Sequence, residues 1–199
     1  MADKQKTLLI CCGATAREIL SIVNANGMDH MKVESLPAAL HNTPQFIPER
    51  VREKIQANRD HYERIMVLYS DCGTGGRLQK VLEEEGVEGL GGAHCYEMYA
   101  GAAAFAEITD EEIGCFFLTD YLTRHFDRLV YQGLGLDRHP ELRDSYFGNY
   151  KKVLYLAQRD DPDLRARAAV AAERLGLELE IRQTGFGNYQ DFLSRHAGK

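Results

Sequence analysis

The chain has 199 residues, 44% of them hydrophobic, and a formal net charge of −6. This length and apolar content suit one packed core, so we expect residues 1–199 to form a single domain. The acidic balance, with both signs interspersed, argues against nucleic acid as a partner. No apolar run reaches the length of a membrane span, and the N-terminal segment lacks a secretory cleavage site. These features predict a cytoplasmic protein and leave its oligomeric state open.

Apolar runs that are typical of buried parallel strands alternate along the chain with amphipathic helical segments. The expected strands cover residues 7–12, 31–36, 65–69, 87–90, 115–118, 153–156 and 177–181. The expected helices cover residues 14–27, 48–65, 77–85, 95–105, 120–130 and 162–175. This alternation predicts a three-layer α/β fold, in which one mainly parallel sheet of five to seven strands is flanked by helices.

One long stretch, residues 133–150, shows no regular pattern. Loops of this length inside compact domains are often functional. We therefore expect this stretch to be either a lid or an interaction surface.

The five cysteines are an odd number in a chain without a secretory signal, so we expect free thiols. Cys12, Cys72 and Cys95 follow three expected strands, at the edge where open parallel sheets bind ligands. Cys11 and Cys115 lie within strands, where a thiol usually acts as a small apolar group. Position therefore separates three candidate functional thiols from two structural ones.

Three thiolates at one edge of a sheet would suit a soft or borderline metal. Cys12, Cys72 and Cys95 could bind zinc and leave a fourth position open, or hold a [4Fe–4S] cluster with one free iron. His94 and His41 are candidates for a fourth ligand. Two alternatives stay open: redox or nucleophilic thiols without a metal, and small residues tolerated where strands turn. The residues alone assign no catalytic role.

A glycine-rich turn after the strand at 65–69 is a second candidate site. Gly73, Thr74 and Gly75 precede a helix, and the backbone N–H groups there could hold a phosphate or a carboxylate. The alternative is that glycine only supplies a tight turn. His41 and Asn42 follow the second expected strand and could face the same edge.

Several segments together resemble one family, the domain of unknown function family 1638, over residues 8–155. They are LLICCGATAREI, LPAALHNTPQFIP, DCGTGG, GAHCYEMYAGAAAF, FFLTDYLTRHFD and GLGLDRHPELRDSYFGNY. The resemblance implies a cytoplasmic bacterial or archaeal protein, often encoded near corrinoid-dependent methyltransferases, without an assigned activity. Its pattern falls on the positions Cys12, His41, Asn42, Asp71, Cys72, Gly73, Gly75, His94, Cys95 and Tyr96.

Together, these features predict a metal–thiolate protein, with zinc or an iron–sulfur cluster, that acts on a small anionic molecule in corrinoid-linked methyl transfer. One alternative is a non-catalytic accessory protein that delivers a metal or cofactor to a methyltransferase. The other is a metal-free phosphate- or nucleotide-binding module built on the glycine-rich turn. We assign metal binding to Cys12, Cys72, Cys95 and His94. We assign substrate or anion binding to Gly73, Thr74, Gly75, His41, Asn42, Asp71 and Tyr96.

Overall fold

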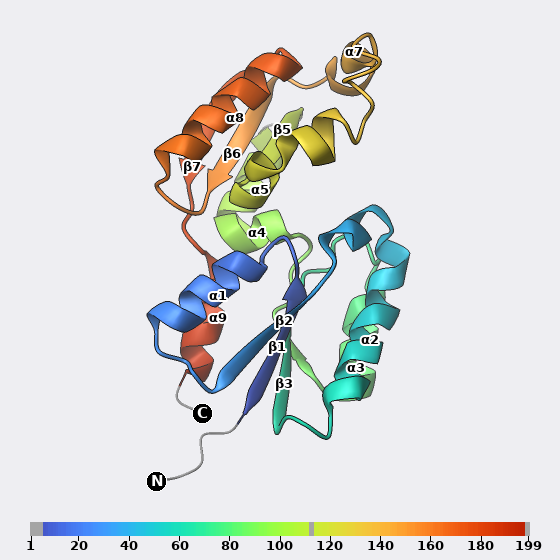
Figure 1. Ribbon diagram of the computed structural model, residues 1–199, viewed down its shortest axis with the longest axis vertical. Coiled ribbons are helices and arrows are strands. Elements are labelled where there is room, and N and C mark those ends of the chain that lie inside the picture. The colour runs from blue at the N-terminus through green and yellow to red at the C-terminus, as the bar shows by residue number, and fades with distance from the viewer. Residues whose placement is uncertain (1–5, 112–113, 198–199) are drawn as a thin grey trace. The chain divides into compact units, whose positions relative to one another are not determined.

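The structure is a computed structural model that describes residues 6–111 and 114–197. The chain divides into two compact units, each with its own parallel sheet (Figure 1). Unit 1 contains the described residues up to Met98 and from Phe186 onward, and unit 2 runs from Tyr99 to Gly185.

Unit 1 contains a four-stranded parallel sheet with the strand order β2-β1-β3-β4. Its strands are β1 (Thr7–Cys12), β2 (Met31–Leu36), β3 (Arg64–Leu68) and β4 (Glu88–Gly89). Its helices are α1 (Ala16–Ala25), the 3₁₀ turns η1 (Ala38–Asn42) and η2 (Pro44–Phe46), α2 (Ile47–Asn58), α3 (Arg77–Glu85) and α9 (Asn188–His196). Helix α4 (Cys95–Ala100) begins in unit 1 and continues into unit 2.

The sheet of unit 1 is covered on both faces, which explains the continuous apolar run of β1. Leu8 and Ile10 pack into a core cluster with residues of α2 and α3. Figure 1 shows α1 and α9 on the opposite face of this sheet. In the register, Cys12 pairs with Leu36 of β2 and Cys11 pairs with Leu68 of β3, so the three strands end at one level. The loops that follow these strands therefore gather at one edge.

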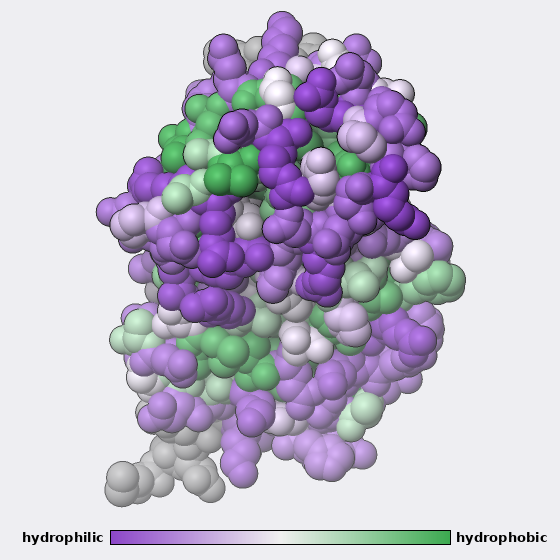
Figure 2. Space-filling view, turned by 45° about the horizontal axis from the view of Figure 1, so that its top comes forward, coloured by the Kyte–Doolittle hydropathy of each residue, from purple (hydrophilic) through white to green (hydrophobic). Residues whose placement is uncertain are grey.

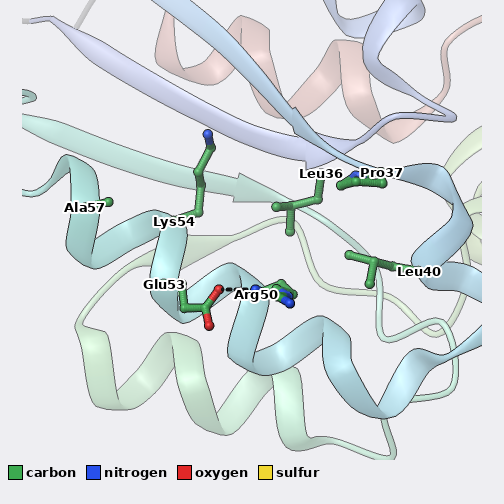
Figure 3. A pocket seen from close by; sticks show the side chains of 7 residues that line it. All are labelled: Leu36, Pro37, Leu40, Arg50, Glu53, Lys54 and Ala57. Carbon is green, nitrogen blue, oxygen red and sulfur yellow. Dashed lines mark hydrogen bonds and ion pairs between the residues drawn. The ribbon is translucent and has the colours of Figure 1, made fainter.

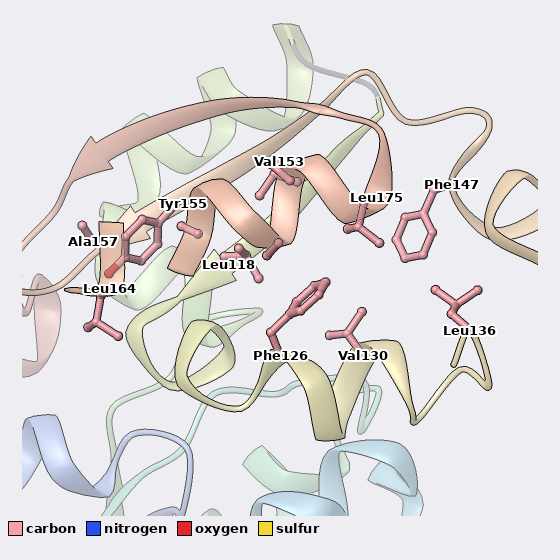
Figure 4. Close-up of a cluster of buried hydrophobic side chains, with 13 residues drawn as sticks. Leu118, Phe126, Val130, Leu136, Phe147, Val153, Tyr155, Ala157, Leu164 and Leu175 are labelled. Atoms are coloured by element: carbon pink, nitrogen blue, oxygen red, sulfur yellow. The ribbon is translucent and has the colours of Figure 1, made fainter. Parts of the chain in front are cut away.

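Unit 2 contains a three-stranded parallel sheet with the order β5-β6-β7. Its strands are β5 (Cys115–Thr119), β6 (Lys152–Ala157) and β7 (Glu178–Gln183). Its helices are α5 (Ala102–Glu111), α6 (Asp120–Arg124), the π-helical turn η3 (Asp127–Tyr131), α7 (Leu142–Phe147) and α8 (Pro162–Leu175). Val153 and Tyr155 of β6 pack against Leu164 and Leu175 of α8 in an apolar core (Figure 4).

The α/β class and the parallel pairing of the strands are confirmed, but the expectation of one sheet is wrong. Within residues 6–111 and 114–197 the strands form two sheets, of four and three strands. Strand–helix alternation predicts parallel pairing, but it does not say which strands share a sheet. Strand β4 has only two residues, and β5 starts a new sheet after α4 and α5. That residues 1–199 form a single domain stays a prediction.

Several helix boundaries differ from the sequence-based ones for local reasons. The helix expected at 95–105 breaks at Gly101, whose φ of +84° only glycine adopts readily. The helix expected at 48–65 ends at Asn58, and the one expected at 120–130 changes to a π-helical turn after Arg124. The irregular stretch 133–150 contains the short α7, and α9 was not expected.

The surface shown in Figure 2 is mainly hydrophilic, with apolar residues in separate patches. Phe46 and Val170 are the most exposed of the large apolar side chains in the described ranges. Among the helices of residues 6–111 and 114–197, none combines the length and the apolarity that a membrane crossing would require.

Candidate functional site

Two loops at the carboxyl edge of the unit 1 sheet are joined by backbone hydrogen bonds. Asp71 N–H donates to Gly92 O at 2.9 Å, and Cys72 N–H donates to Ala93 O at 2.9 Å. The loop after β3 is therefore fixed against the loop that leads into α4. This pairing brings Cys72 close to the residues that open α4.

Three metal-binding side chains form a compact group at this edge. Each of His41, Cys72 and His94 offers one ligand atom, and these three atoms lie within 4.8 Å of one another. His41 comes from η1 after β2, Cys72 follows β3, and His94 precedes α4. The imidazole rings of His41 and His94 meet edge to face, with centroids 5.5 Å apart. His41 is exposed, so the group can be reached from solvent.

The backbone at Cys72 adopts a left-handed conformation, with φ of 46°. Residues other than glycine and asparagine seldom adopt this region, and such strained residues cluster at functional sites. The hydrogen bond from Cys72 N–H to Ala93 O helps to hold this conformation. The strained backbone at Cys72 therefore holds its thiol near His41 and His94 at a cost to local stability.

The Cys72 thiol is strongly acidic. A hydrogen bond from the Cys95 side chain outweighs burial and, with a further hydrogen bond from His41, lowers the pKa of Cys72 to about 4. The same contact with Cys72 raises the pKa of His41, whereas burial lowers that of His94. These shifts favour a thiolate at Cys72 and a neutral imidazole at His94, the states in which these side chains bind metals, whereas the shift of His41 favours its protonated form.

Cys95 and Cys12 lie beside this compact group. The Cys95 sulfur is 3.6 Å from Nδ1 of His94, and its pKa is raised by the neighbouring Cys72 and by burial. The Cys12 sulfur accepts a hydrogen bond from Ala14 N–H at 3.5 Å, and burial raises the pKa of this thiol. Cys12 interacts electrostatically with both other thiols. The three cysteines chosen from the sequence thus interact with one another, although only Cys72 belongs to the compact group.

The glycine-rich turn is occupied from within the chain, which contradicts the expected anion site. The Asp71 carboxylate accepts hydrogen bonds from Gly75 N–H at 3.0 Å and from Gly76 N–H at 2.8 Å. It also accepts one from the Thr74 hydroxyl, and Thr74 N–H donates to the Asp71 carbonyl. Since these donors already bind a carboxylate of the chain, the turn offers them to no external phosphate.

The remaining residues considered in the sequence lie either beside the group or away from it. Tyr96 N–H donates to Nδ1 of His94 at 3.3 Å, and the two rings are 4.2 Å apart, so Tyr96 orients this histidine. Asn42 is exposed at the end of η1, next to His41. Cys11 is fully buried, which raises its pKa to about 12, and Cys115 lies in β5 of unit 2.

A groove of about 470 Å³ lies between the end of β2, η1 and α2 (Figure 3). Its cations are paired: Arg50 contacts Glu53 at 2.8 Å, and Lys54 contacts Glu34 at 2.6 Å. An anion would have to compete with these carboxylates, so the groove adds no support for an anionic substrate. It is lined by Leu36, Pro37, Leu40, Arg50, Glu53, Lys54 and Ala57.

Sequence reasoning missed Tyr69, which follows β3 and is 3% exposed. Its hydroxyl interacts with the Cys12 thiol and, more weakly, with Cys72. Burial and these two groups raise the pKa of Tyr69. A tyrosine at the end of an otherwise aliphatic strand, three residues before Cys72, is the signal that could have identified it.

None of the curated proteins compared with this chain matches it. One family model matches residues 35–193, and its description is "Protein of unknown function (DUF1638)". The matched segment contains His41, Cys72, His94 and Cys95, whereas Cys12 precedes it. Because the match covers most of the chain, the protein belongs to the DUF1638 family.

Proposed function

We propose that this protein is a metal–thiolate protein whose carboxyl-edge site binds one zinc ion. The observation that carries this proposal is the convergence of His41, Cys72 and His94, with their ligand atoms within 4.8 Å. Zinc bonds of about 2.0–2.1 Å to nitrogen and about 2.3 Å to sulfur require only a small contraction of such a group.

Cys95 is the best fourth ligand. Its sulfur lies 3.6 Å from Nδ1 of His94, beside the group, and a hydrogen bond joins it to Cys72. Two imidazoles and two thiolates favour zinc over a [4Fe–4S] cluster, which usually takes four cysteines.

The exposure of His41 favours a reactive site over a purely structural one. A structural zinc site is closed by four held ligands, whereas a catalytic site keeps an exchangeable position. His41 is the exposed member of the group, so an incoming molecule can displace it. A small thiol suits this position, because sulfur binds zinc well and its proton is lost to solvent on binding. The substrate anion would then be a thiolate formed at the site.

The corrinoid neighbourhood implied by the family resemblance suggests what such a thiol would receive. In that setting, the sulfur would attack the methyl group of a methylcorrinoid. A carbon–sulfur bond would form, and the methyl–cobalt bond would break with its electron pair left on cobalt. The cytoplasm, where we expect the protein, would keep all five cysteines as the free thiols that the structure contains.

An accessory role in metal delivery is the alternative, and the same exposed ligand would suit it. The two roles differ in exchange and turnover. An enzyme retains its zinc through many methyl transfers, whereas a delivery protein passes zinc to an acceptor protein and shows no turnover with a thiol and methylcorrinoid.

Metal analysis of the full chain, purified without oxygen, tests the proposal. We expect about one zinc per chain and a sharp loss in Cys72→Ser and His94→Ala, because each removes a ligand from the centre of the group. Cys115→Ser and His61→Ala are matched controls, since Cys115 lies in unit 2 and His61 is an exposed loop residue. Equal metal content in all four variants would disprove the site.

A further inference from the structure

The hydroxyl group of Tyr69 lies in an unusual environment for a buried polar atom. The side chain is 3% exposed, and its oxygen has no regular hydrogen-bond partner within the described residues. Buried hydroxyl groups nearly always have a partner, because leaving one without it costs stability. We therefore expect the Tyr69 hydroxyl to form a hydrogen bond when the site binds its metal.

The surroundings of Tyr69 identify that interaction. Its ring packs in the core cluster under α2 and α3, and Cys12 packs against the same cluster. Among the neighbouring side chains, the Cys12 thiol has the largest effect on this hydroxyl.

Cys12 in turn interacts with both Tyr69 and Cys72. Strand β1, which ends at Cys12, lies between β2, which leads to His41, and β3, which leads to Cys72. Its thiol interacts electrostatically with Cys72, but it is not a member of the compact donor group. Cys12 is thus a neighbour of Cys72 that interacts with it from outside the donor group.

We propose that Tyr69 and Cys12 form a hydrogen-bond relay to the metal-bound sulfur of Cys72, with Cys12 as a positioning residue and not a ligand. The Tyr69 O–H donates to the Cys12 sulfur, and the Cys12 S–H donates to Cys72. Such outer contacts orient ligands and reduce the electron donation of a thiolate to its metal. This inference rests on the proposed metal site and revises the sequence-based assignment of Cys12 as a ligand.

Cobalt(II) is the probe, because it replaces zinc and its sulfur-to-metal absorption reports on the bound thiolates. The full chain is loaded with Co²⁺, and its affinity and spectrum are compared among Cys12→Ala, Cys12→Ser, Tyr69→Phe and wild type. Cys12→Ala and Tyr69→Phe should bind one Co²⁺ with about tenfold lower affinity, because an outer contact is lost. Their sulfur-to-metal absorption should move to lower energy, since Cys72 becomes a better electron donor.

Cys12→Ser distinguishes the relay from direct ligation. A serine hydroxyl still donates to Cys72, so the relay predicts affinity and absorption close to wild type. If Cys12 were a ligand, this variant would lose sulfur-to-metal absorption and affinity as Cys72→Ser does, and the relay would be overturned. Tyr62→Phe is the matched control, because Tyr62 packs partly buried against the same core cluster.

The outcomes separate this inference from the proposed function. If the wild-type chain binds no Co²⁺, the metal site itself fails and the relay fails with it. If the wild-type chain binds Co²⁺ and Tyr69→Phe leaves affinity and absorption unchanged, only the relay fails. A purely structural hydroxyl would change the melting temperature without moving the absorption, and that result also contradicts the relay.

Discussion

The carboxylate of Asp71 accepts hydrogen bonds from Gly75 N–H and Gly76 N–H and from the hydroxyl of Thr74. Partial burial opposes its ionisation, but these hydrogen bonds outweigh burial and lower the pKa of Asp71. The residue therefore acts as an internal anion for the turn. Because Cys72 is the next residue, the same hydrogen bonds fix the loop from which this thiol projects.

Replacing Asp71 by asparagine tests this role. An amide keeps the size but lacks the charge and one acceptor, so Asp71→Asn should destabilise the chain by about 1–3 kcal/mol. Zinc affinity should fall as well, because the Cys72 loop is held less firmly. Urea denaturation and competition with a chelator measure the two effects. Asp29→Asn, at an exposed loop position, should change neither, and an equal effect there would refute the role.

At single positions, the sequence predicted which side chains would gather at the carboxyl edge, and their role as a binding site stays a prediction. Cys72, His94 and Cys95 were found because residues after parallel strands meet at one edge. His41 was named both as a candidate fourth ligand and as a substrate contact, since a one-dimensional pattern cannot show that η1 brings it within 4.8 Å of Cys72. The glycine-rich turn was predicted to bind an anion, because the sequence does not show that the Asp71 side chain folds back onto the turn.

Helices α2 and α3 are joined at the element scale by a cluster around Glu85. Arg52 contacts the Glu85 carboxylate at 3.0 Å, Arg59 at 2.6 Å and Gln56 at 2.8 Å. The Gln56 amide, followed by the Arg59 guanidinium, lowers the pKa of Glu85. These contacts clamp the two helices that cover one face of the unit 1 sheet.

The lowered pKa of Glu85 gives a pH-dependent stability. A carboxyl with a depressed pKa stabilises the fold above its unfolded value, about 4.3, and the contribution disappears as pH falls through the folded value. Wild type should therefore have a higher urea midpoint than Glu85→Gln at neutral pH, and the difference should shrink in acid. Glu63→Gln, at an exposed position, should show no such difference. A gap between wild type and Glu85→Gln that does not change with pH would contradict the assignment.

Element boundaries were predictable where one signal dominated. Strands β1 and β2 have the predicted bounds, and α8 starts at Pro162, where Asp161 caps its first turn. Prediction failed where tertiary packing decides. The pattern of α9 is short, and it becomes a helix because its buried residues Phe192 and Leu193 pack in unit 1. The break at Gly101 also needed the backbone angle, which composition does not give.

At the scale of the whole molecule, the chain passes from unit 1 to unit 2 and back, and α4 spans the first boundary. Unit 2 has a buried polar network of its own. The Tyr155 hydroxyl donates to Asp120 at 2.7 Å, and Gln158 N–H donates to the same oxygen at 3.0 Å. Asp120 is 0% exposed, so these bonds contribute directly to the stability of unit 2.

Tyr155→Phe tests whether the whole chain unfolds as one domain. Loss of this buried hydrogen bond should cost about 1–3 kcal/mol. Alkylation of Cys11 in unit 1 and Cys115 in unit 2, followed by mass spectrometry across a urea series, reports each unit separately. If residues 1–199 form one domain, as the sequence predicts, both midpoints should fall together. A shift of the Cys115 midpoint alone would indicate two domains. Tyr150→Phe, at an exposed tyrosine, is the control.

The return of α9 to unit 1 has a consequence for how the protein is made. A ribosome completes β1, β2, β3 and β4 early, but it makes α9 only after the whole of unit 2. Domains usually fold in the order of their synthesis. Here the nascent sheet of unit 1 lacks α9 on one face while unit 2 is translated. Unit 1 therefore completes its fold only after α9 has left the ribosome.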